Sequence, residues 1–115
     1  MTSSIDLFES FWTELKPDLI NFLDVSWKSY KDIAAQDIEE FLTKSKEDIE
    51  GFFLLFQNGS ISQDELDWLI KGEKDLMTLS GLRKAGLSQV ALDSFSSGVI
   101  DLVLSSALKF VPTLL

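Results

Sequence analysis

The sequence predicts an all-α protein, in which a long antiparallel helical hairpin turns at Asn58-Gly59 and shorter helices flank it at both ends of the chain. Apolar residues recur every three or four positions through most of the sequence, without sustained alternation of period two. The 115 residues include only two prolines, so helix-sized runs lack their strongest breaker. The Asn-Gly pair ends one apolar helical run, and Ser62-x-x-Glu65, the pattern of a capping box, opens the next. A chain of this length is normally one domain, so we expect residues 1–115 to form one elongated three- or four-helix bundle, with oligomerisation as one way of completing it.

The first predicted helix covers residues 4–15. Ser4 suits its N-cap, and the acidic residues that follow suit the positive end of a helix. Pro17 then has two interpretations, because proline either starts a new helix in its first turn or kinks a continuous one.

The second predicted helix covers residues 18–57. The apolar positions keep the helical period throughout, and charged residues occupy the opposite face. The pattern predicts one amphipathic helix of about 40 residues, roughly 60 Å long at 1.5 Å per residue. A helix of that length without internal caps is typical of a coiled coil or a long bundle arm.

The third predicted helix covers residues 62–85. Arg83 and Lys84 suit a helix C-terminus, and Gly86 followed by Ser88 indicates a stop and a new N-cap. The alternative is one continuous helix from Ser62 to Val111.

The final predicted helix, residues 88–111, is the least polar part of the chain. Its apolar residues point in most directions, so it must be covered on several sides. Three kinds of cover are available: the other helices of the same chain, a second copy, or a membrane surface. We rank the first two level and the membrane third, because the final helix lacks the basic face of most membrane-surface helices.

A stripe of mostly small residues marks the face through which another helix could approach closely. As the residues of a helix-packing and self-association surface we single out Gly81, Ala85, Ala91, Phe95, Gly98 and Leu102. The alternative is that the same face packs within one chain.

Phe8, Trp12 and Leu15 have the i, i+4, i+7 spacing of an acidic helix that docks into the groove of a partner. We keep them as candidate partner anchors. The favoured alternative is a stripe that faces the core of the chain itself.

The sequence contains little that supports a catalytic site or a metal site. The chain has no Cys and no His, which removes thiolate chemistry and the metal sites built on those ligands. We interpret three acidic clusters, Asp37-Glu39-Glu40, Glu47-Asp48-Glu50 and Asp64-Glu65-Asp67, as a solvated face, because neighbours on a helix point in different directions. Ser106-x-x-Lys109 matches the spacing of some acylases but lacks their companion motifs. We therefore expect no enzyme activity, no metal and no cofactor.

The formal net charge of −9 is concentrated in the first half of the chain, where residues 1–57 carry 12 acids against 5 lysines. An acidic chain repels nucleic-acid phosphates, so we expect no nucleic-acid partner. No signal peptide precedes the first helix and no apolar run is long enough to span a bilayer, so we expect a cytoplasmic protein. The first functional hypothesis is a non-enzymatic, self-associating assembly protein. The alternative is a small acidic inhibitor or immunity-type protein that binds a basic partner, and the third is a peripheral membrane protein.

Overall fold

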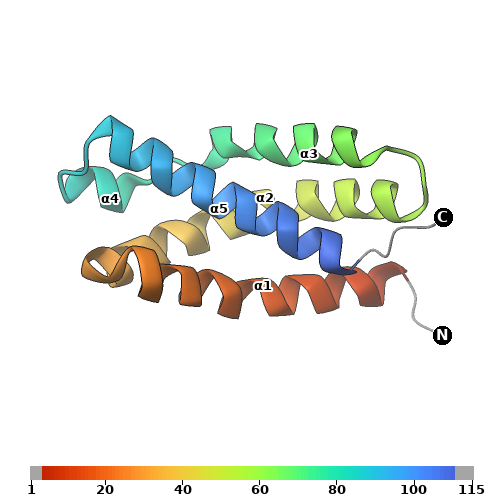
Figure 1. Cartoon of the computed structure of the whole chain (residues 1–115), viewed down its shortest axis with the longest axis horizontal. Helices are drawn as coiled ribbons and strands as arrows, with labels where there is room; N and C mark the ends of the chain where they lie inside the picture. The colour runs from red at the N-terminus through yellow and green to blue at the C-terminus, as the bar shows by residue number, and fades with distance from the viewer. Residues whose placement is uncertain (1–3, 111–115) are drawn as a thin grey trace.

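The computed structural model describes residues 4–110, with side chains from residue 7 onward, and this part of the chain is helical with short connections (Figure 1). The prediction of an all-α protein is confirmed. The elements in chain order are α1 (Ser4–Ser26), the 3₁₀ helix η1 (Lys28–Tyr30), α2 (Lys31–Gln57), α3 (Gln63–Gly72), the 3₁₀ helix η2 (Glu73–Leu76), α4 (Ser80–Lys84) and α5 (Gln89–Phe110).

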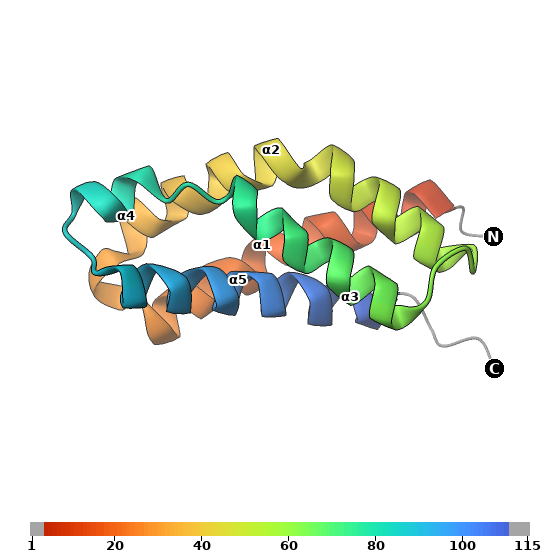
Figure 2. The same cartoon turned by 90° about the horizontal axis from the view of Figure 1, so that it is seen from above.

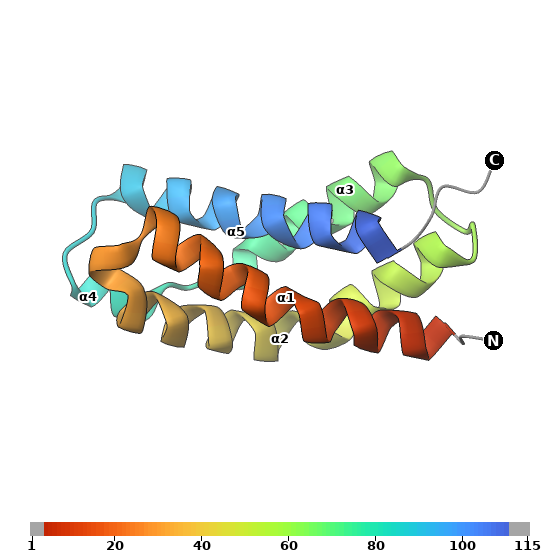
Figure 3. The same ribbon diagram turned by 60° about the horizontal axis from the view of Figure 1, so that its bottom comes forward.

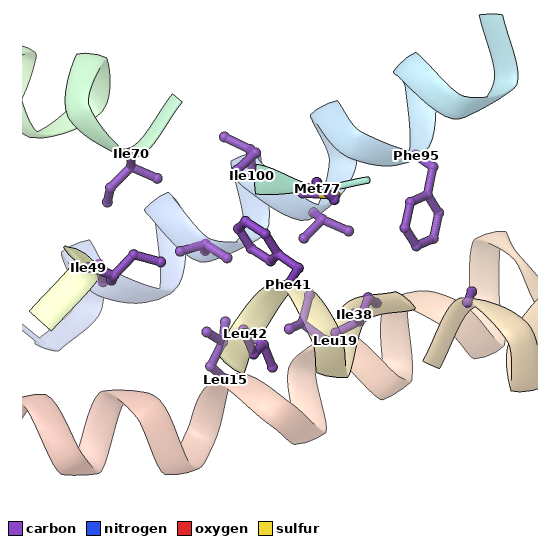
Figure 4. Packing of buried hydrophobic residues seen from close by; sticks show 14 of the residues in the cluster. Leu15, Leu19, Ile38, Phe41, Leu42, Ile49, Ile70, Met77, Phe95 and Ile100 are labelled. Carbon is purple, nitrogen blue, oxygen red and sulfur yellow. The ribbon is translucent and has the colours of Figure 1, made fainter. Parts of the chain in front are cut away.

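The helices pack side by side into an elongated body of 46 × 23 × 22 Å. Helix α1 lies against both α2 and α5, while α2 also contacts α3 and α4, and α3 contacts α5 (Figures 2 and 3). The core is a continuous strip of apolar side chains between these helices (Figure 4). Its largest fully buried members are Phe8, Phe11, Phe41, Phe53 and Phe95.

The predicted division between the first two helices is wrong. Helix α1 runs through Pro17 to Ser26, so a 40-residue helix from residue 18 to 57 does not exist. Proline costs a helix one backbone hydrogen bond, and Pro17 lies on the exposed face, where water can satisfy the carbonyl that loses its partner. The break comes instead at Trp27, whose ring packs edge-on against Phe95 of α5 at a centroid distance of 5.1 Å.

The turn at Asn58-Gly59 forms as the sequence predicts. Gly59 adopts a positive φ of 82°, and the Asn58 side-chain oxygen accepts a hydrogen bond from the Ser60 backbone N–H at 3.0 Å. Ser62 and Glu65 make both bonds of the capping box, at 3.1 and 3.0 Å. Helix α3 therefore starts where local hydrogen-bond chemistry places it.

The third predicted helix, residues 62–85, is also wrong, because it is three pieces instead of one. Helix α3 tightens into η2 after Gly72, and residues 77–79 leave the helical path before α4 begins. The predicted break at Gly86 is confirmed: Gly86 has a φ of 92° and the Ser88 hydroxyl accepts a bond from the Ala91 N–H at 3.2 Å. One continuous helix from 62 to 111 is thereby excluded.

Candidate functional site

Helix α5 is covered by helices of its own chain. It lies antiparallel to α1 along most of its length, and α3 and η2 contact it from another side (Figure 3). Its buried residues are Leu92, Phe95, Ser96, Val99, Ile100, Val103, Ser106 and Ala107. All of its exposed residues except Val90 are polar, so most of the apolar residues that the sequence places in this segment are buried or half-buried within one molecule.

The small-residue stripe packs partly inside the chain. A methyl group added at Gly98 would come within 2.7 Å of the Phe22 ring of α1, and the neighbouring Phe95 ring touches the rings of Phe22 and Trp27. A methyl group at Gly81 would come within 2.8 Å of Ile33 of α2. These two glycines let helices of the same chain approach closely.

The remaining members of the stripe are more accessible. Ala91 and Leu102 are half-buried, and Ala85 is exposed at the end of α4. The six residues therefore do not form one free face on the outside of the molecule.

The three candidate anchors lie in or beside the core. Phe8 and Leu15 are completely buried, and Phe8 contacts the rings of Phe11 and Phe53. Trp12 is half-buried, and its ring stacks on Phe8 at 5.6 Å. While the chain is folded in this way, only the edge of Trp12 is available to a partner.

Trp12 also lines a shallow surface groove of about 470 Å³ between α1 and α2. The groove is lined by Trp12, Thr13, Lys16, Glu39, Leu42, Thr43 and Lys46. Lys16 and Glu39 form an ion pair across it at 3.1 Å, so their charges largely neutralise each other. Both side chains are more than half exposed, and such pairs add little to stability.

The sequence analysis missed the most exposed aromatic side chain of the described residues, Trp68 of α3. It is 74% exposed and stands on the outer face of α3, away from the buried Leu66 and Ile70. On the same helix, Asp67 and Lys71 form an ion pair at 2.8 Å, and Asp64 lies one turn before Trp68. The exposure of Trp68 could have been predicted from the sequence, because Trp68 falls outside the apolar stripe of its helix.

The surroundings of Trp68 are acidic. Residues 47–67, which include the second half of α2 and the start of α3, contain Glu47, Asp48, Glu50, Asp64, Glu65 and Asp67. The same range contains no Lys or Arg, so it carries a formal charge of −6. Leu55, also within it, is 41% exposed. This end of the molecule therefore combines negative charge with exposed apolar groups.

A second set of exposed apolar residues lies at the other end of the molecule, where α1 turns into α2 and where α5 begins (Figure 1). Val25 and Val90 are 76% and 80% exposed, and Tyr30 and Ile33 are partly exposed. Lys28 and Lys31 belong to the connection from α1 to α2, and Arg83 and Lys84 form the last turn of α4, shortly before α5.

Two acids from the predicted solvated face have other roles. Asp37 is buried, and its carboxylate accepts hydrogen bonds from the backbone N–H groups of Gly81 at 3.0 Å and Leu82 at 2.8 Å. It thereby caps the start of α4 from a different helix. Glu73 of η2 is only 8% exposed, and Asp48 of α2 is its acidic neighbour. Burial, followed by the contact with Asp48, raises the pKa of Glu73 to about 7.

No metal or catalytic constellation is assembled within residues 4–110. No group of three or more Asp or Glu side chains converges there in the manner of a metal site. Ser106 donates a long hydrogen bond of 3.4 Å to Asp18 of α1.

Comparison with known proteins adds no assignment, because no family model, no curated protein and no solved structure matches this chain.

The expectation that no apolar run is long enough to span a bilayer is corrected by α5, which among the described residues has the length and mean hydropathy to cross a membrane. Buried core helices of soluble proteins share these properties, so this observation carries little weight by itself.

Proposed function

We propose that this chain is a non-enzymatic helical protein that binds a basic protein partner through the outer face of α3, with Trp68 as the central contact. The observation that carries the proposal is the 74% exposure of Trp68. Tryptophan is enriched among the few residues that dominate the energy of protein interfaces, because one side chain buries a large, rigid apolar area. A partner that covers Trp68 would recover the free energy that its exposure to water costs.

The charge around Trp68 supports a basic partner. The six acids of residues 47–67 repel an acidic surface and attract a basic one. A symmetric contact of two copies through this face would bring like charges together, which disfavours a second copy here. Opposite charge mainly accelerates association and makes it sensitive to salt, because exposed charges are screened within about 8 Å at physiological ionic strength.

As part of the proposal, the working form is a closed four-helix bundle in one chain. The hairpin of α2 and α3 is completed by α1 and α5, which pack on it and on each other. In that form the buried Phe8 and Leu15 act as core residues, and the partner-binding role passes to Trp68.

Affinity capture from a native lysate, followed by titration of the purified partner, tests the proposal. We expect a basic partner whose binding weakens at high salt and at least tenfold in Trp68→Ala, equivalent to about 1.4 kcal/mol. Val90→Ala is the matched control, because Val90 is equally exposed at the opposite end of the molecule. Unchanged affinity in Trp68→Ala, or equal losses in both variants, would refute the assignment of this face.

Self-association through helix packing is the second candidate function. It is supported by Val25 and Val90, two aliphatic side chains that are three-quarters or more exposed at the same end of the molecule. Sedimentation at micromolar concentration tests it: a concentration-dependent dimer that Val25→Asp abolishes would support it. A monomer at all concentrations would reject it.

Peripheral membrane binding is the third candidate. The length and mean hydropathy of α5 support it, while the burial of eight of its residues against other helices opposes it. Flotation with neutral and anionic vesicles is the test, and a protein that stays in the aqueous fraction with both would end this candidate.

A further inference from the structure

The segment Glu73–Lys84, here called the flap segment, follows α3 in the chain and runs along the first half of α2 (Figure 2). It consists of η2, three non-helical residues and the five-residue α4. Met77, Leu79 and Leu82 are its buried apolar side chains, and Met77 lies above Phe41 of α2 in Figure 4. The carboxylate of Asp37 holds its second half by the two bonds to Gly81 and Leu82.

Two unfavourable features are concentrated in this short segment. Leu79 has a φ of 54° and a ψ of 40°, and it is the only non-glycine residue of the described chain with a positive φ. A left-handed conformation costs an L-residue with a branched side chain conformational energy. The second feature is Glu73, whose Oε1 atom is buried and has no hydrogen-bond partner. Both costs would be relieved if the segment left α2.

Among the described residues, no Lys or Arg forms an ion pair with Glu73. Asp48 of α2 is the one charged neighbour that influences its protonation, and it acts in the direction that favours the neutral form. In α3, Lys71 is paired with Asp67, and the charge of Asp101 of α5 also acts on Lys71. In the flap segment itself, Lys74 reaches the Ser97 hydroxyl of α5 at 3.4 Å. An ionised Glu73 would therefore be a buried, uncompensated charge next to a second carboxylate.

We propose that the flap segment is a pH-sensitive element that stays closed on α2 while Glu73 is protonated and opens when its carboxyl group ionises. Opening frees the strained backbone at Leu79 and lets the Glu73 carboxylate reach water. It also uncovers the apolar side chains beneath, on α2 and on the segment itself, so the surface offered to other molecules changes with pH. This device does not depend on the role proposed for Trp68.

The direction of the effect follows from proton linkage. The pKa of Glu73 is about 7 in the closed form and returns toward the ordinary 4.5 in the open form. The stability of the closed form is fully present below pH 4.5 and is lost as the pH rises through 7. A difference of about 2.5 pH units corresponds to an increase in the opening equilibrium of up to about 300-fold, and an increase of at least about tenfold is the smallest that supports the proposal.

Hydrogen exchange resolved by residue, at pH 5 and pH 8 and corrected for the intrinsic exchange rate, tests the proposal. In the wild-type chain we expect protection in residues 74–84 to fall at least tenfold more than protection in α1 and α5. Glu73→Gln, which keeps the shape and removes the charge, should abolish this difference, and Asp48→Asn should reduce it. Glu47→Gln, an exposed acid one position before Asp48, is the matched control and should behave as wild type.

Three results would overturn the proposal. The first is equal protection of the segment at both pH values. The second is a parallel loss of protection in all helices, which would mean that the molecule opens only as a whole. The third is an unchanged pH response in both Glu73→Gln and Asp48→Asn, and the use of two variants keeps the test valid if one of them does not fold.

Discussion

Replacement of Asp37 by alanine should detach the start of α4 from α2 and destabilise the whole molecule. The Asp37 carboxylate is buried and accepts two backbone hydrogen bonds, at 3.0 Å from Gly81 and 2.8 Å from Leu82. Hydrogen bonds to a charged group contribute about 1.5–3 kcal/mol, and removing an N-cap acceptor costs about 1 kcal/mol. Since the two bonds share one carboxylate and are not additive, we expect a loss of about 2–4 kcal/mol in the free energy of unfolding.

Urea unfolding followed by circular dichroism at 222 nm measures this loss. Asp37→Asn should lose less, about 1–2 kcal/mol, because its amide oxygen can still accept one of the two bonds. Asp32→Ala, an exposed change on the same helix, should stay within about 0.5 kcal/mol of wild type. If Asp37→Ala were as stable as Asp32→Ala, the account of how α4 is held would be refuted.

Three further predictions concern other contacts. Gly98→Ala should lower the free energy of unfolding, measured in urea, by about 1–3 kcal/mol, because the added methyl group collides with Phe22. In the double variant, Phe22→Leu should restore part of this loss. An unchanged free energy in Gly98→Ala would mean that α1 and α5 are not this close. Trp68→Ala should change the free energy of unfolding, measured by thermal denaturation, by no more than about 0.5 kcal/mol, since the side chain is mostly exposed. A larger loss would show that Trp68 belongs to the core. Glu73→Gln should raise the free energy of unfolding at pH 8 by up to about 3 kcal/mol, because a pKa difference of 2.5 units corresponds to about 1.36 kcal/mol per unit. This gain should vanish toward pH 4, where Glu73 is protonated in both the folded and the unfolded chain. Denaturant titrations at both pH values measure the gain, and a gain that does not depend on pH would contradict the burial of an ionisable Glu73.

The parts of the fold that the sequence predicted correctly depend on local chemistry. The turn at Asn58-Gly59 and the capping box of Ser62 and Glu65 need only residues within a few positions of each other, so their pattern is visible in the sequence. The stop at Gly86 is of the same kind, because its φ of 92° is a conformation that glycine adopts without the steric cost of a side chain.

The incorrect predictions concern breaks that depend on distant contacts. The chain reverses after Ser26 without glycine or proline, and Trp27 is held there by Phe95, which lies 68 positions further along the sequence. The apolar period continues through this reversal, so periodicity alone could not reveal it. In the same way, α4 begins at a strained Leu79 because Asp37 of α2 supplies its cap.

The candidate surface was predictable only in part. Trp68 lies off the apolar stripe of its helix and could have been selected on that ground. The burial of Glu73 and its proximity to Asp48 depend on how η2 packs on α2. In the sequence, Glu73 is a charged residue followed by a lysine, and this pattern does not indicate that it is buried.

The central claim is that α5 is covered by α1 of its own chain, through the contact between Gly98 and Phe22. The most direct test is an NMR experiment on a mixture of isotope-labelled and unlabelled copies, in which contacts within a chain and between chains are recorded separately. The account predicts a cross-peak between the Phe22 ring and the Gly98 α-protons in the intrachain spectrum and none in the interchain spectrum. The same cross-peak in the interchain spectrum, or its absence from both, would contradict the account.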